Sequence, residues 1–415
     1  MGNGSAGSHD LSPGRRVLIA LVVFLFFTRG FSTSLLYSLL PRLKSLFGLT
    51  YTQAMLIQMF FFLGYLVFSL PAAWLMARLG YTRAILLGIA VMVGGCLTFC
   101  LAAMTGVYSG FLAALFVVAT GIILLQVATN PFIATLGSAQ GAPSRLTLAQ
   151  AFNSLGTTIA PLVGAWLILG PAGISPGYAA VAMRVTSTTS LQLPFAAVAA
   201  ALVFTAVLLW RRPSDQIGGS QVHDLRSGFR LLKDKRFAFA VMSIFIYVGA
   251  EVSVGSIIVS YLTLPSVLSV SPARASGLLS LYWGGAMLGR FIGSAALRVV
   301  PANTAVAAYA FAAMLLALTS FCSAGLIAAI AIIAIGLFNS IIFPTLFTLG
   351  IADLGDRTAE GSGILCMAIS GGAAIPMITG LVADRLGLTA ALLVPAACYG
   401  LITLYGVFVA RPRTT

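Results

Sequence analysis

The chain has 415 residues, of which 60% are hydrophobic and 8% are charged, and its mean hydropathy is +1.04. A soluble domain carries about 25% charged residues, so this composition excludes an ordinary soluble protein and indicates a membrane protein. A net charge of +14 would be compatible with a nucleic-acid partner. Most of the basic residues, however, fall in the tails and loops expected on one side of a membrane, as the positive-inside rule describes. We therefore expect a surrounding lipid bilayer and no nucleic acid.

Twelve apolar segments follow one another along the chain, each long enough to cross ~30 Å of hydrocarbon. The expected helices lie at 16–40, 53–77, 82–104, 108–137, 147–170, 192–211, 238–262, 276–299, 303–324, 327–351, 361–384 and 388–410. The predicted fold is an all-α membrane protein of twelve transmembrane helices.

A basic run between Arg226 and Arg236 predicts a cytoplasmic linker between two six-helix bundles. Both termini are expected in the cytoplasm, because the basic residues gather on that side. The expected divisions are a tail at 1–15, a first bundle at 16–211, the linker at 212–237, a second bundle at 238–410 and a tail at 411–415.

One polar pattern occurs once in each half of the chain. Gln126 lies five residues before Pro131, Asn339 lies five residues before Pro344, and Thr-Leu-Gly follows at the same offset in both halves. In hydrocarbon, a buried amide must find a partner and a proline removes a backbone hydrogen bond. We expect both helices to break at these prolines, beside a polar site near the middle of the membrane in a duplicated chain.

Five amides form a candidate substrate site: Gln126, Asn130, Gln150, Asn153 and Asn339. An amide donates and accepts hydrogen bonds, as the hydroxyls of a hexose do, without a charge that hydrocarbon would penalise. Trp283 and Tyr282 could stack on the apolar face of a pyranose. The alternative is that these amides only hold helices together, and Asn130 could do no more than cap a broken turn.

Charged residues inside the predicted helices are few. Glu251 is the one acid among nine that falls in the middle of a helix, and an intramembrane carboxylate is a functional candidate by default. Arg29 lies at the same depth in the first helix as Glu251 does in the seventh. We expect an ion pair between them, either structural and gating or coupled to protons or substrate. Arg145, just before the fifth helix, is expected to be a gate or a loop anchor.

Five longer strings carry a resemblance to a known family. They are Leu125-Gln-Val-Ala-Thr-Asn-Pro-Phe, Ser144-Arg-Leu-Thr-Leu-Ala-Gln-Ala-Phe-Asn-Ser-Leu-Gly-Thr-Thr-Ile-Ala-Pro, Tyr247-Val-Gly-Ala-Glu-Val-Ser-Val-Gly-Ser, Tyr282-Trp-Gly-Gly-Ala-Met-Leu-Gly-Arg-Phe-Ile-Gly-Ser and Gly336-Leu-Phe-Asn-Ser-Ile-Ile-Phe-Pro. The chain resembles the fucose–glucose/galactose permeases of the major facilitator superfamily, and within them the bacterial glucose/galactose branch. The resemblance implies sugar import across a bacterial inner membrane by alternating access, usually with proton coupling.

The first helix departs from that family. Where relatives hold an Asn-Asp pair, whose aspartate is the expected proton carrier, this chain has Leu36 and Tyr37. Arg29 stands where an aromatic residue is usual, and Gln126 replaces a glutamate of the fucose branch. Tyr37 becomes a candidate substrate contact. Three alternatives stay open: facilitated diffusion, proton coupling through Glu251, or a different substrate such as an N-acetylated, acidic or disaccharide sugar.

Other classes of protein fit the sequence less well. An exporter of the same superfamily or a non-transporting membrane sensor would share the architecture. An enzyme is not expected, because the two histidines, His9 and His223, lie in the tail and the linker. The five cysteines show no metal-ligand spacing. We expect no metal and no cofactor, a sugar as the small-molecule partner, protons as the candidate coupling ion, and a monomer.

Overall fold

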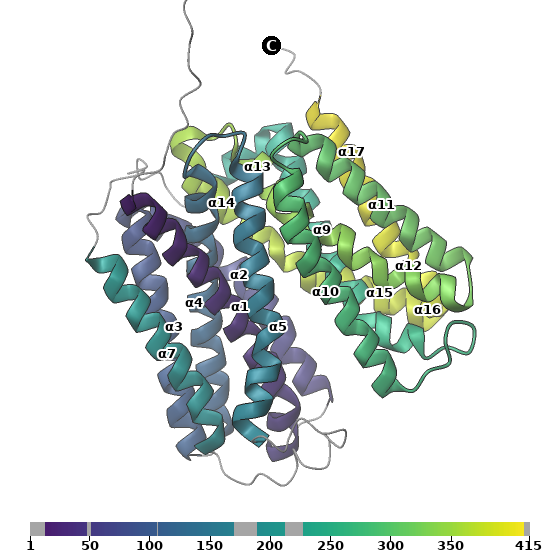
Figure 1. Cartoon of the computed structure of the whole chain (residues 1–415), viewed down its shortest axis with the longest axis horizontal. Helices are drawn as coiled ribbons and strands as arrows, with labels where there is room; N and C mark the ends of the chain where they lie inside the picture. Colours follow the sequence, from purple (N-terminus) through teal and green to yellow (C-terminus); the bar gives the residue numbers. More distant parts are fainter. Residues whose placement is uncertain (1–12, 48–50, 106, 170–188, 212–226, 411–415) are drawn as a thin grey trace, which may run out of the picture.

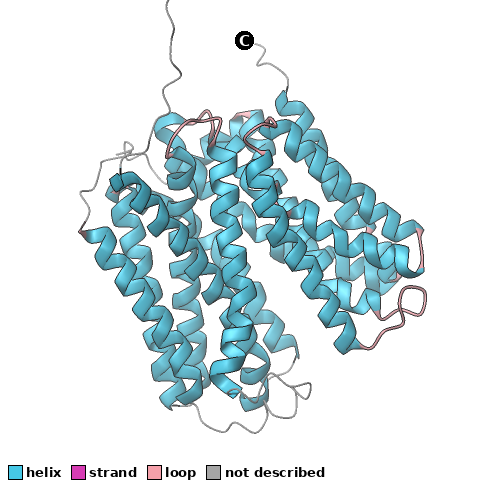
Figure 2. Ribbon diagram, viewed as in Figure 1, coloured by secondary structure: helices cyan, strands magenta, loops and turns pink. Residues whose placement is uncertain are grey.

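The computed structural model describes residues 13–47, 51–105, 107–169, 189–211 and 227–410. These residues form helices and short connecting loops, and the described part of the chain contains no β-strand (Figure 2). Ten helical segments within it are long and apolar enough to cross a membrane. Two further long helices, which carry several of the candidate site residues, complete the twelve predicted spans.

The first half of the chain supplies six long helices. They are α1 (Pro13–Phe47), α2 (Tyr51–Leu79), α3 (Tyr81–Thr105), α4 (Tyr108–Thr135), α5 (Ala142–Leu169) and α7 (Thr189–Trp210). Each forms because an apolar chain in hydrocarbon must satisfy its own backbone polar groups, and a helix does so within the segment. The two long helices outside the ten are α5 here and α10 in the second half.

The second half repeats this arrangement with more interruptions. It contains α8 (Ser227–Arg230), η2 (Leu231–Lys233), α9 (Lys235–Leu262), α10 (Pro272–Ala296), α11 (Ala302–Cys322), α12 (Gly325–Asn339), α13 (Ile342–Ile351), η3 (Gly355–Arg357), α14 (Thr358–Met367), η4 (Ala368–Ser370), α15 (Gly371–Leu386), α16 (Leu388–Ala391) and α17 (Leu393–Ala410). Asp234 caps α9 by accepting hydrogen bonds from the amides of Arg236 and Phe237 at 2.8 and 3.1 Å, as N-cap residues do. All twelve predicted segments are therefore found as helices.

The two predicted proline breaks have different outcomes. The helix is interrupted between α12 and α13, just before Pro344, so that prediction is confirmed. The predicted break at Pro131 is wrong, because α4 runs through this proline. Proline has no amide to donate to the carbonyl four residues earlier, which here is that of Val127. Ser362 Oγ donates to this carbonyl at 2.8 Å instead, so the helix continues with the carbonyl satisfied.

The two halves pack by the same close approach of two helices. A Cβ atom at Gly156 of α5 would lie 2.2 Å from the carbonyl oxygen of Phe27 in α1. A Cβ atom at Gly371 of α15 would lie 1.9 Å from the carbonyl oxygen of Phe245 in α9. Only glycine allows helix backbones this near to each other. Because each glycine lies five residues before the proline of its helix, the duplication in the sequence is also a duplication of packing.

Helices α1–α7 form one group and α9–α17 a second group beside it, except that α14 packs against α2 and α4 of the first group (Figure 1). The groups meet where α5 begins and α10 ends. There Ser144 Oγ donates to the carbonyl of Ser294 at 2.6 Å, and the rings of Phe152 and Phe291 pack edge to face with centroids 5.8 Å apart. Toward the opposite end, α5 and α10 separate (Figure 1). The bundles are therefore closed against each other on the side where the described chain ends.

Candidate substrate site between the two bundles

Arg29 of α1 lies buried where the two bundles meet, with 4% of its surface exposed. Its Nη2 donates to Gln150 Oε1 of α5 at 3.3 Å, and its guanidinium carbon lies 4.7 Å from the ring centroid of Phe26. The neighbouring Gly30 sets this geometry, since a Cβ there would lie 2.0 Å from the carbonyl oxygen of Asn153. Close contact of α1 with α5 thus holds the arginine against the glutamine.

A second pair joins α2 to α4. The Tyr65 hydroxyl donates to Gln126 Oε1 at 2.9 Å, and both side chains are buried. The acceptor end of the Gln126 amide is therefore occupied. Asn130 lies one turn further along α4, fully buried, and neither its side-chain nitrogen nor its side-chain oxygen has a partner among the described residues. Because a buried unpaired amide is costly, this position is suited to a polar ligand.

The second bundle places its own polar cluster on α9, α10 and α12. Asn339 Nδ2 donates to the Tyr282 hydroxyl at 2.8 Å, and that hydroxyl donates to the backbone carbonyl of Glu251 at 3.2 Å. The Tyr247 hydroxyl donates to the carbonyl of Asn339 at 2.7 Å, at the point where α12 ends. The break in this helix therefore has a local function: it exposes a backbone carbonyl to which a tyrosine binds.

Arg290 of α10 connects the clusters. Its Nη2 lies 3.8 Å from Glu251 Oε1, its Nε donates to the carbonyl of Ser340 at 3.2 Å, and its Nη1 donates to Ser154 Oγ of the first bundle. The predicted ion pair between Arg29 and Glu251 is therefore wrong for this conformation. Glu251 and Arg290 lie on neighbouring helices of the second bundle, whereas Arg29 lies in the first bundle and donates to Gln150 of that same bundle.

The other predicted sugar ligands lie in different surroundings. Asn153 Nδ2 donates to the carbonyl of Phe26 at 3.0 Å, which is the helix-joining role of the alternative interpretation. Trp283 is 41% exposed and packs edge to face on Tyr282, with centroids 5.0 Å apart. An exposed indole held by a neighbouring ring is available for stacking. The side chain of Tyr37 lies outside the described part of the structure.

Arg145 lies at the start of α5, away from these clusters. Its Nη2 donates to the carbonyls of Ala134 at 2.6 Å and Ser138 at 2.9 Å, and its Nε donates to the carbonyl of Ile133 at 3.2 Å. These contacts fix the end of α4 and the turn that follows it. Their geometry suits a loop anchor.

Sequence reasoning left Tyr65, Arg290 and Ser154 out of the site. Arg290 carried a usable signal, because it is the second arginine inside a predicted helix and the one nearer in sequence to Glu251. Tyr65 also carried one, as a phenol within a long apolar stretch. Ser154 gave none, since serines in membrane helices commonly bond their own backbone.

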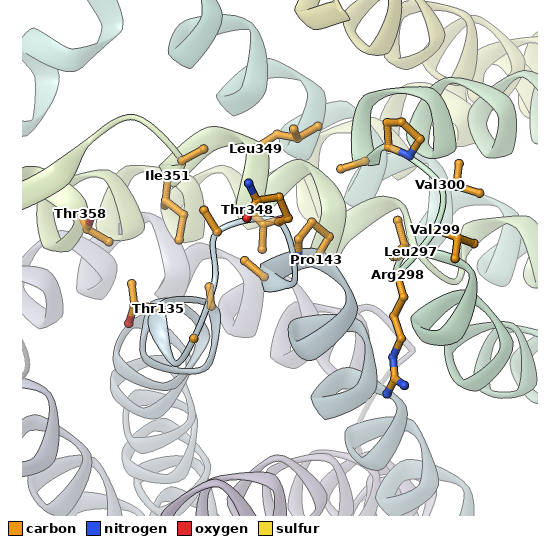
Figure 3. Close-up of a pocket in the computed structure, with 18 of the residues that line it drawn as sticks. Thr135, Pro143, Leu297, Arg298, Val299, Val300, Thr348, Leu349, Ile351 and Thr358 are labelled. Carbon is orange, nitrogen blue, oxygen red and sulfur yellow. The ribbon is translucent and has the colours of Figure 1, made fainter. Parts of the chain in front are cut away.

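A separate cavity of about 690 Å³ lies where the bundles meet on the side of the C-terminus (Figure 3). Its walls come from the turn between α4 and α5, the turn after α10, and the end of α13. Figure 3 shows Thr135, Arg298 and Thr348 among the residues that line it. None of the candidate site residues lines this cavity.

Twelve membrane helices in two repeats, with buried polar clusters where the repeats meet, form the architecture of a secondary transporter. The chain belongs to the Major Facilitator Superfamily, which it matches over residues 22–377. It is 44% identical to the glucose/galactose transporter of Brucella abortus biovar 1 (strain 9-941) over 387 residues, or 93% of this chain and 92% of that one.

Two further similarities extend this assignment. The chain is 32% identical to the L-fucose-proton symporter of Escherichia coli strain K12, across 98% of this chain and 96% of the symporter. The solved structure of the transporter FucP in the outward conformation matches with a TM-score of 0.86 and 31% identity, covering 96% of this chain and 100% of that chain. These similarities confirm the family resemblance that the sequence carries. They also confirm that the protein is a multi-pass membrane transporter rather than an enzyme.

Proposed function

We propose that the protein moves a hexose of the glucose/galactose type across a bacterial inner membrane by alternating access. One observation carries this proposal: each bundle has a buried polar cluster, and Arg290 contacts residues of both bundles. Such midplane clusters are where transporters of this architecture bind substrate. The similarity to a glucose/galactose transporter supports a hexose as that substrate.

The same proposal assigns a direction to the structure. With both termini in the cytoplasm, the side on which Ser144 meets Ser294 faces the cytoplasm, and the side on which α5 and α10 separate faces outward. The likeness to an outward conformation of a related transporter supports this orientation. The units that rock would be the bundles 16–211 and 238–410, in a transporter that works as a monomer.

Transport is proposed to run downhill without protons. Gln126 cannot titrate, and a phenol such as that of Tyr37 titrates near ~10. Glu251 lies beside the guanidinium of Arg290, whose positive charge opposes the effect of burial and favours the charged carboxylate in this conformation. A second candidate is proton symport through Glu251. The similarity to a fucose-proton symporter favours it, and so does the 3.8 Å separation from Arg290, which exceeds an ordinary charge-assisted hydrogen bond.

Counterflow in proteoliposomes tests the proposed function. Vesicles are loaded with unlabelled sugar, and the entry of labelled glucose is followed against a panel of neutral hexoses. We expect glucose or galactose inside to accelerate the entry of label, and an equal concentration of sucrose to leave it unchanged. Absence of exchange with every hexose, from protein that is monodisperse in detergent, would contradict the proposal.

A further inference from the structure

Arg29 is a buried cation without a carboxylate partner among the residues that the structure describes. Its Nη1 has no hydrogen-bond partner and no exposed surface in the described structure, and its one side-chain acceptor is the neutral amide of Gln150. Charged side chains are almost never buried unless they are paired, and an unpaired buried charge is strongly destabilising. A residue of this kind persists where a ligand supplies the missing charge.

The chain itself cannot supply that charge from mid-membrane. Of its nine acidic residues, Glu251 alone lies in the middle of a membrane helix, and its carboxylate is beside Arg290. Two arginines and one glutamate leave one positive charge between the bundles. Arg290 also has Ser340 and Ser154 as acceptors. The excess charge therefore belongs to Arg29.

Unpaired hydrogen-bonding groups accompany this charge. Helix α1, which carries Arg29, packs against α4, which carries Gln126, and the Tyr65 hydroxyl donates to Gln126. One turn beyond Gln126 is Asn130, whose amide is buried with neither atom paired. A cation with a free donor and an amide whose donor and acceptor are both free thus lie on two contacting helices of the first bundle.

We propose that the preferred substrate is a sugar acid of the hexuronate class, with its single carboxylate bound by Arg29. The carboxylate accepts from Nη1 of Arg29, and the ring hydroxyls bond the amides of Asn130 and Gln126. This assignment rests on the proposed sugar transport and narrows its substrate class. A planar guanidinium matches a carboxylate in both charge and donor geometry.

The size of the excess charge selects among modified sugars. A phosphate ester carries about −1.5 to −2 at neutral pH, which would exceed the one positive charge available. An N-acetyl group is neutral and would leave Arg29 unpaired. A carboxylate carries one negative charge and balances the site.

The wild-type protein in proteoliposomes gives the first test. Counterflow of labelled glucuronate and of labelled glucose is measured over a range of concentrations, with galacturonate, galactose and N-acetylglucosamine as competitors. We expect both labels to exchange, with a half-saturation concentration for glucuronate about 10-fold or more below that for glucose. Exchange of glucose without glucuronate would overturn the inference and leave the proposed function standing. Failure of both labels would overturn both.

Two variants then assign the effect to Arg29. In Arg29→Gln the charge is lost but an amide donor remains, so glucuronate should lose about 10-fold or more in affinity while glucose exchange persists. Arg29→Lys keeps the charge and should retain part of the preference. Arg211→Gln, at an exposed arginine at the end of α7, is the matched control and should resemble the wild type. An unchanged glucuronate preference in Arg29→Gln would overturn the role of Arg29. If that variant does not fold, the wild-type competition panel still decides the substrate class.

Discussion

Ser362 in the second bundle donates a hydrogen bond from its Oγ to the backbone carbonyl of Val127 in the first, over 2.8 Å. Val127 lies four residues before Pro131, so its carbonyl has no amide within its own helix. In the second half, the carbonyl of Ser340 is freed in the same way by Pro344 and accepts from Arg290. In both repeats, the proline makes a backbone acceptor available to another helix.

Ser362→Ala should weaken the closed side of the transporter. A hydrogen bond of this kind contributes ~0.5–1.5 kcal/mol, so the ratio of closed to open molecules should fall by ~2- to 10-fold. Spin labels at the exposed residues Gln140 and Val299, in a background without native cysteines, would report the opening as longer distances. Ser256→Ala is the control, because that hydroxyl bonds only within α9. Identical distance distributions in wild type and Ser362→Ala would contradict the prediction.

Pro131→Ala tests the same contact from its other partner. Alanine restores an amide that can bond the Val127 carbonyl within α4, in competition with Ser362. The substitution should therefore open the closed side, as Ser362→Ala does, and the two effects should not add in the double variant. Additive opening of the labelled distance would separate the proline from the serine and refute the shared mechanism.

Glu251 and Arg290 should depend on each other for stability. Removal of one member of a buried ion pair leaves an uncompensated charge, which destabilises the fold by ~3–5 kcal/mol when the pair is fully buried. The loss of stability should be smaller here, because both side chains are about 15% exposed. Arg290→Gln should lower the melting temperature in detergent more than Glu251→Gln, because it also loses two hydrogen bonds. The double variant should melt above Arg290→Gln alone. A double variant less stable than both single variants would count against the pairing.

Gln126→Ala should weaken substrate binding by ~1–3 kcal/mol, because it removes hydrogen bonds from a desolvated site. Tyr65→Phe is the matched variant: it removes the donor to Gln126 Oε1 but leaves the amide, so its effect on affinity should be smaller. The half-saturation concentration for counterflow measures both. An unchanged half-saturation concentration in Gln126→Ala, with normal expression, would contradict the prediction and indicate that the substrate binds to the helices of the second bundle.

Tyr37→Asp should make transport depend on pH. The wild type should exchange sugar at a constant rate between about pH 5.5 and 8, since a phenol does not titrate there. An aspartate in the membrane must be neutralised before it crosses apolar surroundings, so the variant should exchange faster at low pH than at high pH. Tyr37→Asn, neutral and similar in size to aspartate, is the control. A pH-dependent wild type, or two variants that behave alike, would be the contrary result.

Much of the fold was predictable, because every segment in hydrocarbon has to form a helix and the apolar runs are long. The ends of the helices were less predictable. The eighth predicted helix begins earlier than expected, since Ser271 caps it by accepting from the amide of Arg274 at 3.4 Å and Pro272 is its first residue. The continuity of α4 could not be predicted, because the donor to Val127 comes from Ser362 in the other half of the chain.

The site was predictable in its residue types and less so in its pairings. Buried amides and Glu251 stand out against an apolar background. Which arginine meets Glu251 depends on how α9 packs on α10, and equal depth in two repeats cannot decide between partners in different bundles. The location of Asn153, which bonds the backbone of α1, shows the same limit, because one amide can serve either a ligand or a neighbouring helix.

Uptake of labelled glucose into proteoliposomes, with and without an imposed inward proton gradient, tests most directly whether this protein carries sugar downhill. We predict that internal glucose rises to the external concentration in both cases, and that Glu251→Gln does not alter this final level. Accumulation above the external concentration that requires the gradient and is lost in Glu251→Gln would contradict the account and make Glu251 the proton carrier.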